Sequence, residues 1–223
     1  MTEDFAVVGT GTGVGKTVVT AGLVGTLRDA GVDARAVKPC QTGYPPDDDA
    51  GFVAEVCGTA AAATCLRRLE PPLAPEVAAD EAGRALSYEA ILTDCERALA
   101  DAACGVLEGV GGLRVPLAEG RDVIDLVADL GLPAVVVARS GLGTLNHSAL
   151  TVEALRRRDI PVRGVVLNEY EAATVAERTN PAVLARMVDL PVETLPPLDL
   201  TDPTAVVTET ADNLSRSLLD TVG

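Results

Sequence analysis

The chain has 223 residues, 48% of them apolar and 23% charged, a length and composition that predict one globular domain over residues 1–223. Its net charge of −15 is spread along the whole sequence, which argues against nucleic acid and anionic membranes as partners. No run of about 18 apolar residues is free of charge, and the acidic N-terminus is unlike a secretory signal, so we expect a cytoplasmic protein.

Two features of the composition bear on chemistry. Five cysteines without a Cys-x-x-Cys pair, and a single histidine, disfavour a zinc site and are typical of free thiols in a reducing compartment. Lysine occurs only at Lys16 and Lys38 among 18 basic residues. Scattered acids, few lysines and 2% aromatic residues predict a halophilic protein. A surface that avoids lysine keeps one only where its chemistry is needed, so both lysines are candidate functional residues.

The predicted elements alternate between strands and helices. In chain order we expect a strand at 4–9, a helix at 16–31, a strand at 34–39, a helix at about 50–57, a helix at 87–102 and a strand at 104–108. A helix at 123–131, a strand at 133–138, a helix at 146–159, a strand at 162–168, a helix at about 171–187, a strand at 192–195 and a helix from about 204 follow. Residues 58–86 show no periodicity that predicts an element. The alternation indicates an α/β fold, a single domain with a mostly parallel sheet of about seven strands and helices on both faces.

The segment between the first strand and the first helix reads GTGTGVGKT, residues 9–17. Glycines let a loop turn its N–H groups around phosphate oxygens, and the start of the helix adds positive partial charge. Lys16 would then reach the β- and γ-phosphates, and the Thr17 hydroxyl would bind Mg²⁺. The usual phosphate-loop pattern starts at Thr10 here, because Gly9 is one residue too far from Gly15. A dinucleotide-binding turn lacks this lysine and threonine, so it fits less well.

A magnesium ion needs oxygen ligands beyond Thr17. Glu108 ends the predicted strand at 104–108, at the sheet edge where the phosphate loop also lies, and is the first candidate. One of Asp47, Asp48 and Asp49 is the second, although a run of three acidic residues is also typical of a solvated loop. The residues themselves leave open which of the three aspartates binds the metal.

Four segments together resemble the dethiobiotin synthetase family of P-loop NTPase-like proteins. They are GTGTGVGKT, VKPCQTG, EGVGGLRVPL and GLGTLNHSALTVEAL, and VLNEY and TLPPL extend the resemblance to about residue 198. The resemblance implies an ATP-dependent ligase that carboxylates 7,8-diaminononanoate with CO₂ and closes a cyclic urea. It also implies Mg²⁺ as cofactor, ATP as co-substrate and a homodimer in which a helix of the second subunit completes each site.

The same resemblance implies roles for individual residues. Those with expected catalytic roles are Lys38, Lys16 and Thr12, and those expected to bind metal are Thr17, Asp49 and Glu108. The expected nucleotide site consists of Gly13, Val14, Gly15, Lys16, Thr17, Val18, Asp49, Glu108, Gly109, Val110, Gly111, Asn168, Pro196, Pro197 and Leu198. The expected substrate site consists of Thr12, Lys38, Thr42, Gly143, Thr144, Leu145 and Asn146. Asp49 is preferred over its two neighbours only because Ala50 follows it, as in the family.

Other functions fit the sequence less well. A partitioning or scaffold ATPase of the deviant Walker type carries a signature lysine where this chain has Gly11. An amide-forming ligase of the cobyrinic acid family usually has a glutaminase domain, for which the chain has no room. A GTPase would place an Asn-Lys-x-Asp motif after a strand. Thr12 and Thr42 fit turn residues as well as substrate ligands, while His147 fits a residue at a helix start and Cys40 fits a packing position.

Overall fold

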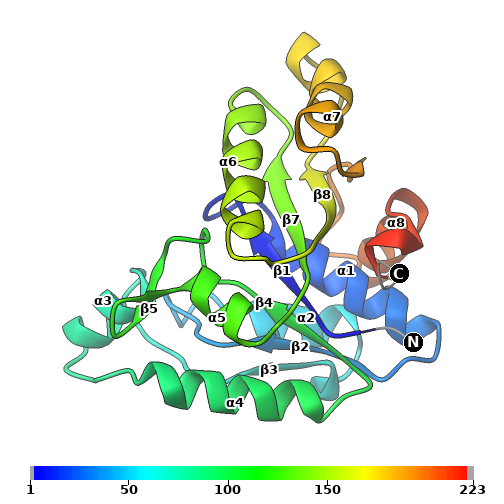
Figure 1. Ribbon diagram of the computed structural model, residues 1–223. Coiled ribbons are helices and arrows are strands. Elements are labelled where there is room, and N and C mark those ends of the chain that lie inside the picture. The colour runs from blue at the N-terminus through cyan, green and yellow to red at the C-terminus, as the bar shows by residue number, and fades with distance from the viewer. Residues whose placement is uncertain (1–2, 220–223) are drawn as a thin grey trace.

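The computed structural model describes residues 3–219 and is built around one parallel sheet of seven strands (Figure 1). The strands lie in the order β3-β2-β4-β1-β7-β8-β9. Their bounds are β1 (Phe5–Gly9), β2 (Ala34–Lys38), β3 (Ala63–Cys65), β4 (Cys104–Glu108), β7 (Ala134–Arg139), β8 (Val162–Asn168) and β9 (Val192–Thr194). The predicted α/β class and strand number are confirmed.

Helices cover both faces of the sheet. On one face lie α1 (Lys16–Asp29), α2 (Asp49–Val56) and α8 (Pro203–Asn213), and on the other lie α4 (Tyr88–Ala100), α5 (Val123–Asp129), α6 (Thr144–Arg156) and α7 (Val175–Val188). Successive residues of a strand pack on opposite faces of the sheet. In β1, Phe5 and Val7 pack into one apolar cluster, and Ala6 and Val8 pack into the other. Strands buried on both faces explain why the sequence shows short continuous apolar runs.

The structure differs from the sequence-based expectation mainly in residues 58–86. This segment contains the short helix η1 (Ala60–Ala62), the edge strand β3 and the helix α3 (Pro75–Glu81). β3 is only three residues long and half-buried, so it leaves no detectable alternation. A second sheet, the antiparallel hairpin of β5 (Pro116–Ala118) and β6 (Arg121–Asp122), was also not expected.

Helix ends differ by a few residues from the expected ones. Helix α6 begins at Thr144, two residues before the expected start, because Gly143 adopts a left-handed conformation and serves as its N-cap. Helix α7 begins only at Val175, because Thr174 and Glu177 form a reciprocal capping box there. Within residues 3–219, no helix is long and apolar enough to cross a membrane.

Candidate nucleotide and substrate site

The phosphate loop joins β1 to α1 at the carboxyl end of the central strand. Gly13 and Gly15 have φ angles of 66° and 94°, values that side chains rarely adopt. A Cβ atom on Gly15 would lie 1.9 Å from Nδ2 of Asn168, and this amide donates a hydrogen bond to the carbonyl of Val14 at 3.2 Å. No side chain caps the start of α1. The N–H groups of its first turn are therefore available to an anion.

Lys16 lies at the start of α1 with its side chain almost fully buried. Its Nζ donates a hydrogen bond to the carbonyl of Gly11 at 2.9 Å, which folds the side chain back over the loop. Burial and then repulsion from Lys38 lower the pKa of Lys16 to about 8. Lys16 is therefore mostly protonated at neutral pH and presents a poorly solvated cation to the loop.

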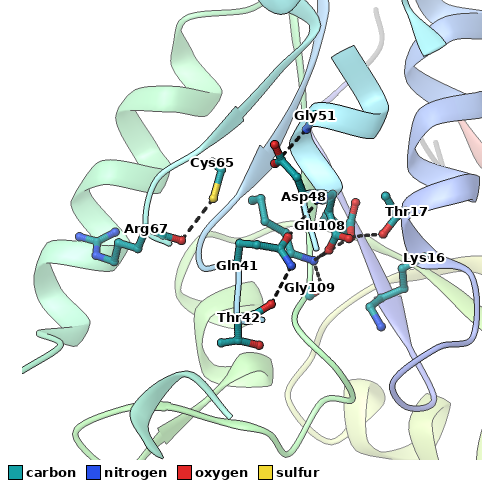
Figure 2. Close-up of polar contacts among 12 residues, drawn as sticks. Lys16, Thr17, Gln41, Thr42, Asp48, Gly51, Cys65, Arg67, Glu108 and Gly109 are labelled. Atoms are coloured by element: carbon teal, nitrogen blue, oxygen red, sulfur yellow. Dashed lines mark hydrogen bonds and ion pairs between the residues drawn. The ribbon is translucent and has the colours of Figure 1, made fainter. Parts of the chain in front are cut away.

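The second lysine lies at the end of β2, between two carboxylates. Lys38 Nζ is 2.8 Å from Oε1 of Glu108 and 2.5 Å from Oδ2 of Asp49, and its side chain is 5% exposed. The same Oε1 of Glu108 accepts a hydrogen bond from the Thr17 hydroxyl at 2.9 Å, as Figure 2 shows. The structure thus brings the three predicted metal-binding residues together: Asp49 and Glu108 contact Lys38, and Thr17 contacts Glu108.

The protonation states in this cluster follow from burial and charge. Burial acts to lower the pKa of Lys38, but the adjacent carboxylates of Glu108 and Asp49 outweigh it and raise this pKa. Burial likewise raises the pKa of Glu108, against the attraction of Lys38. For Asp49 burial acts to raise the pKa, but the charge of Lys38 together with side-chain hydrogen bonds to Lys38, Glu108 and Thr17 outweighs it, and the pKa of Asp49 is lowered. Lys38 is therefore charged at neutral pH, in contact with ionised Asp49.

The three aspartates that the sequence left open take different positions, and Asp47 and Asp49 both line the cavity beside the phosphate loop. Asp48 is the N-cap of α2 and accepts a hydrogen bond from the N–H of Gly51 at 3.1 Å (Figure 2). Asp49 is the residue that reaches Lys38, and its own N–H donates to Oε1 of Gln41 at 3.1 Å. Gln41 is buried and also donates to the carbonyl of Thr42 at 2.9 Å. Gln41 thus holds Asp49 and Thr42 in place, a role the sequence did not indicate.

A cavity of about 440 Å³ collects most of the predicted residues. Those that line it are Thr12, Gly13, Gly15, Lys16, Thr17, Val18, Lys38, Thr42, Asp49, Glu108, Val110, Gly111 and Asn168. A neighbouring cavity of about 280 Å³ shares Val18 and Asn168 with it and adds Pro197 and Leu198. The two cavities thus bring together residues from the expected phosphate, substrate and nucleobase regions, and the roles of these residues stay predictions.

Other predicted residues lie outside these cavities. Val14 packs into the core below the loop, the carbonyl of Gly109 lies 3.3 Å from Lys38 Nζ, and Pro196 lines neither cavity. Residues 143–146 form the start of α6 and line neither cavity within this chain. His147, in the first turn of α6, is exposed.

Two further residues near the loop were not predicted. Arg139 ends β7, and its Nη2 lies 3.3 Å from the carbonyl oxygen of Thr12 and 3.5 Å from that of Gly13. Glu169 lines both cavities. Each follows or ends a strand of the parallel sheet, so the position alone could have suggested them, but no motif distinguishes them from other charged residues.

The fold and the phosphate loop define a P-loop nucleotide-binding protein of the α/β class, and a family model described as an AAA domain matches residues 3–204. A Haloferax mediterranei protein named ATP-dependent dethiobiotin synthetase is 64% identical over 96% of this chain and 92% of its own length. A protein of the same name from Anaeromyxobacter sp. (strain K) is 44% identical over 85% of this chain and 88% of its own. The chain belongs to the ATP-dependent dethiobiotin synthetase family, which confirms the resemblance seen in its motifs.

Similar solved structures describe the same fold. A ParA family ATPase from Chlorobium tepidum has a TM-score of 0.61 at 11% identity and covers 95% of this chain and 96% of its own. The septum site-determining protein MinD from Pyrococcus horikoshii, complexed with Mg-ADP, has a TM-score of 0.57 at 17% identity and covers 94% of this chain and 86% of its own. At such identities the likeness establishes the fold alone, and it does not favour a switch ATPase.

Proposed function

We propose that this protein is an ATP-dependent ligase of biotin biosynthesis that forms dethiobiotin, ADP and phosphate from 7,8-diaminononanoate, CO₂ and ATP. The observation that carries this proposal is the position of Lys38, a buried ammonium that lines the same cavity as the phosphate loop. A carbamate and a triphosphate are both anions, so a site that joins them needs cations at the junction. The only two lysines of the chain meet in this cavity.

The nucleotide would bind along the phosphate loop and the second cavity. The N–H groups of residues 13–18 belong to the phosphate loop and the first turn of α1, where a triphosphate would gain both hydrogen bonds and the helix dipole. Lys16 would exchange its contact with the Gly11 carbonyl for phosphate oxygens. The base would bind in the second cavity. The Asn168 amide, which donates to the Val14 carbonyl, would hydrogen-bond to the edge of the base, and Pro197 and Leu198 would cover its apolar face.

The oxygen ligands present suit a magnesium ion. Thr17, Asp49 and Glu108 supply one hydroxyl and two carboxylates, the hard oxygen donors that this ion prefers. The two carboxylates already contact one cation, Lys38 Nζ, and the Thr17 hydroxyl donates to Glu108 beside it. When bound, Mg²⁺ neutralises part of the negative charge of the phosphates. The three side chains would hold it, and Lys38 would then be free to turn toward the substrate.

The reaction proposed here has three steps. One amine of the diamine takes up CO₂ and loses a proton, which gives a carbamate. A carbamate oxygen attacks the γ-phosphorus of ATP, ADP leaves, and a carbamic-phosphoric mixed anhydride forms. The second amine attacks the carbonyl carbon of this anhydride, phosphate leaves, and the cyclic urea closes. Lys38 would hold the carbamate oxygen against the γ-phosphate, while Thr12 and Thr42 line the substrate side of the cavity.

The carboxylate of the diamine needs a further anion site. Residues 143–146 start α6, whose first turn has no side-chain cap, so its N–H groups suit a carboxylate. These residues lie outside the cavity of their own chain, and we propose that they serve the site of a second subunit in a homodimer.

The composition bears on the environment in which the protein works. The many acidic residues and the scarcity of lysine support a cytoplasm with a high salt concentration.

The test of this proposal is phosphate release from ATP and Mg²⁺ in high-salt buffer with bicarbonate, with and without 7,8-diaminononanoate. We expect diamine-dependent release with one dethiobiotin, identified by mass, for each phosphate. Diamine-independent hydrolysis, or none, would overturn the proposed function and favour a switch ATPase or a different amine substrate.

A further inference from the structure

The segment that leads into α6 consists of Ser140, Gly141, Leu142 and Gly143. Two glycines give its backbone unusual freedom, and the Leu142 side chain is 97% exposed, so apolar packing cannot set its direction. Helix α6 also lacks a side-chain cap at its start. Polar contacts with neighbouring elements must therefore fix the direction in which the first turn of α6 points.

Asn180, in the neighbouring helix α7, supplies one such constraint. Its side chain is buried, and Nδ2 donates to the carbonyl of Ser140 at 2.9 Å and to that of Gly141 at 3.2 Å. The same Gly141 carbonyl accepts a hydrogen bond from the N–H of Thr144, the first residue of α6, at 3.3 Å. Both amide hydrogens of Asn180 are thus used on the two peptide units directly before the helix. Figure 1 shows α6 and α7 side by side.

Ser140 supplies the second constraint. Its buried hydroxyl lies 3.0 Å from the Glu169 carbonyl and 3.0 Å from Oε1 of Glu177, and both of these groups are acceptors. The single hydroxyl proton is therefore donated to one of them or shared between the two. Glu177 is itself fixed, because Oε2 accepts the N–H groups of Ala173 and Thr174 in the capping box of α7. Ser140 thereby ties the start of α6 to α7 and to the loop after β8.

We propose that Asn180 and Ser140 are positioning residues that hold the first turn of α6 in the direction needed to receive the carboxylate of the diamine. This inference rests on the proposed function, in which residues 143–146 bind that carboxylate. Neither residue touches the substrate. The effect of Asn180 is confined to the carboxylate end of the substrate, because its amide bonds the two peptide units before α6, and the phosphate loop and the Lys38 cluster are held by other contacts.

The matched variants are Asn180→Ala and Asn213→Ala. Asn213 is an exposed asparagine of α8 whose amide donates to Glu209 of the same helix, so its variant controls for the loss of an amide. We expect Asn180→Ala to raise the KM for diaminononanoate about tenfold, because a displaced anion site weakens ground-state binding. The kcat and the Kd for ATP should change less than about twofold. Ser140→Ala should show the same pattern with a smaller rise.

The decisive comparison uses the methyl ester of the diamine, which lacks the negative charge. With the ester, Asn180→Ala and the wild-type protein should have the same KM, because there is no carboxylate to misplace. An equal rise in KM for acid and ester, or a KM for the acid that matches the Asn213→Ala control, would overturn the inference. If Asn180→Ala does not fold, Ser140→Ala gives the same comparison. Failure of the wild-type protein to form dethiobiotin would instead refute the proposed function.

Discussion

Lys38 Nζ lies 2.8 Å from Oε1 of Glu108, although the two residues are 70 positions apart in the chain. Each ends a strand, β2 and β4, and these strands pair in parallel, so their last side chains meet at one edge of the sheet. Their side chains are 5% and 2% exposed. Removing one charge leaves the other buried and less well compensated, which is costly in a poorly solvated site.

The first prediction concerns turnover in Lys38→Ala. If Lys38 stabilises the carbamate and the transferring phosphoryl group, turnover should fall by about 10² or more. ATP should still bind, because Lys16 and the loop N–H groups are unchanged. The measurement is the kcat for phosphate release together with the Kd for ATP. Arg35→Ala, a cation removed from the same strand, should keep normal turnover, and near-normal turnover in Lys38→Ala would remove Lys38 from the mechanism.

The second prediction concerns the metal without nucleotide. The ammonium of Lys38 contacts the same carboxylates that are expected to hold Mg²⁺, so it competes with a metal ion for them. Titration of nucleotide-free protein with Mn²⁺, followed by electron paramagnetic resonance, should show tighter binding to Lys38→Ala than to the wild-type protein. Glu108→Gln should bind Mn²⁺ more weakly than either. Weaker binding to Lys38→Ala than to the wild-type protein would contradict the assignment of these carboxylates to the metal.

The third prediction concerns the shape of the phosphate loop. Gly15→Ala would place a Cβ atom 1.9 Å from the Asn168 amide, at a strained backbone φ of 94°, so the Asn168 side chain and the loop must rearrange. The Kd for ATP should rise by about 10² or more, because the N–H groups no longer surround the phosphates. Gly11→Ala is the matched control, since a Cβ there meets nothing within 4 Å. Equal affinities of the two variants would show that the Gly15 conformation is unimportant for binding.

The fourth prediction concerns acid stability. Asp125 accepts hydrogen bonds from the Asp122 N–H at 2.8 Å and from Arg158 Nη2 at 2.6 Å. Burial would raise the pKa of Asp125, but these bonds outweigh it and lower this pKa below its ordinary value of 3.8. The unfolded state therefore binds the proton more readily, so the stabilisation is present above about pH 4 and is lost as the pH falls through the folded pKa.

The Asp125→Asn variant tests the direction of this pH dependence of stability. At pH 7 it should lower the free energy of unfolding by about 1–3 kcal/mol, because a charge-assisted hydrogen bond is lost. Below about pH 4 the difference from the wild-type protein should shrink. Denaturant unfolding in molar potassium chloride measures both, with Asp33→Asn, from an exposed pair with Arg28, as the control. A constant difference across this pH range would contradict the assignment.

Much of the site could be predicted because strand ends and loop motifs are local signals. Glu108 follows four apolar or small strand residues, and Lys16 and Thr17 lie in a recognisable loop. Parallel strands bring their carboxyl ends to one edge, so the meeting of these residues follows from the α/β pattern. The choice of Asp49 over Asp47 and Asp48 depended on the family resemblance, and the geometry of Lys38 and Gln41 supports it.

The contacts that escaped prediction are long-range or lie in weakly patterned segments. Asn180 is 39 residues from Gly141, and an asparagine inside a helix resembles any other polar position until α6 and α7 pack together. Arg139 is 127 residues from Thr12. Strand β3 depends on pairing with β2 and not on its own three residues, because tertiary pairing overrides local preference in so short an element.

Isotope labelling can follow the oxygen that joins carbamate and phosphate in the proposed reaction. C¹⁸O₂ is added in unlabelled water to the wild-type protein with ATP, Mg²⁺ and 7,8-diaminononanoate, and a single turnover is quenched within seconds, before the label exchanges with water. We predict one ¹⁸O in the released phosphate and one in the urea carbonyl of dethiobiotin, both measured by mass. Phosphate without ¹⁸O would mean that water attacks the γ-phosphorus, which would contradict transfer to a carbamate at Lys38.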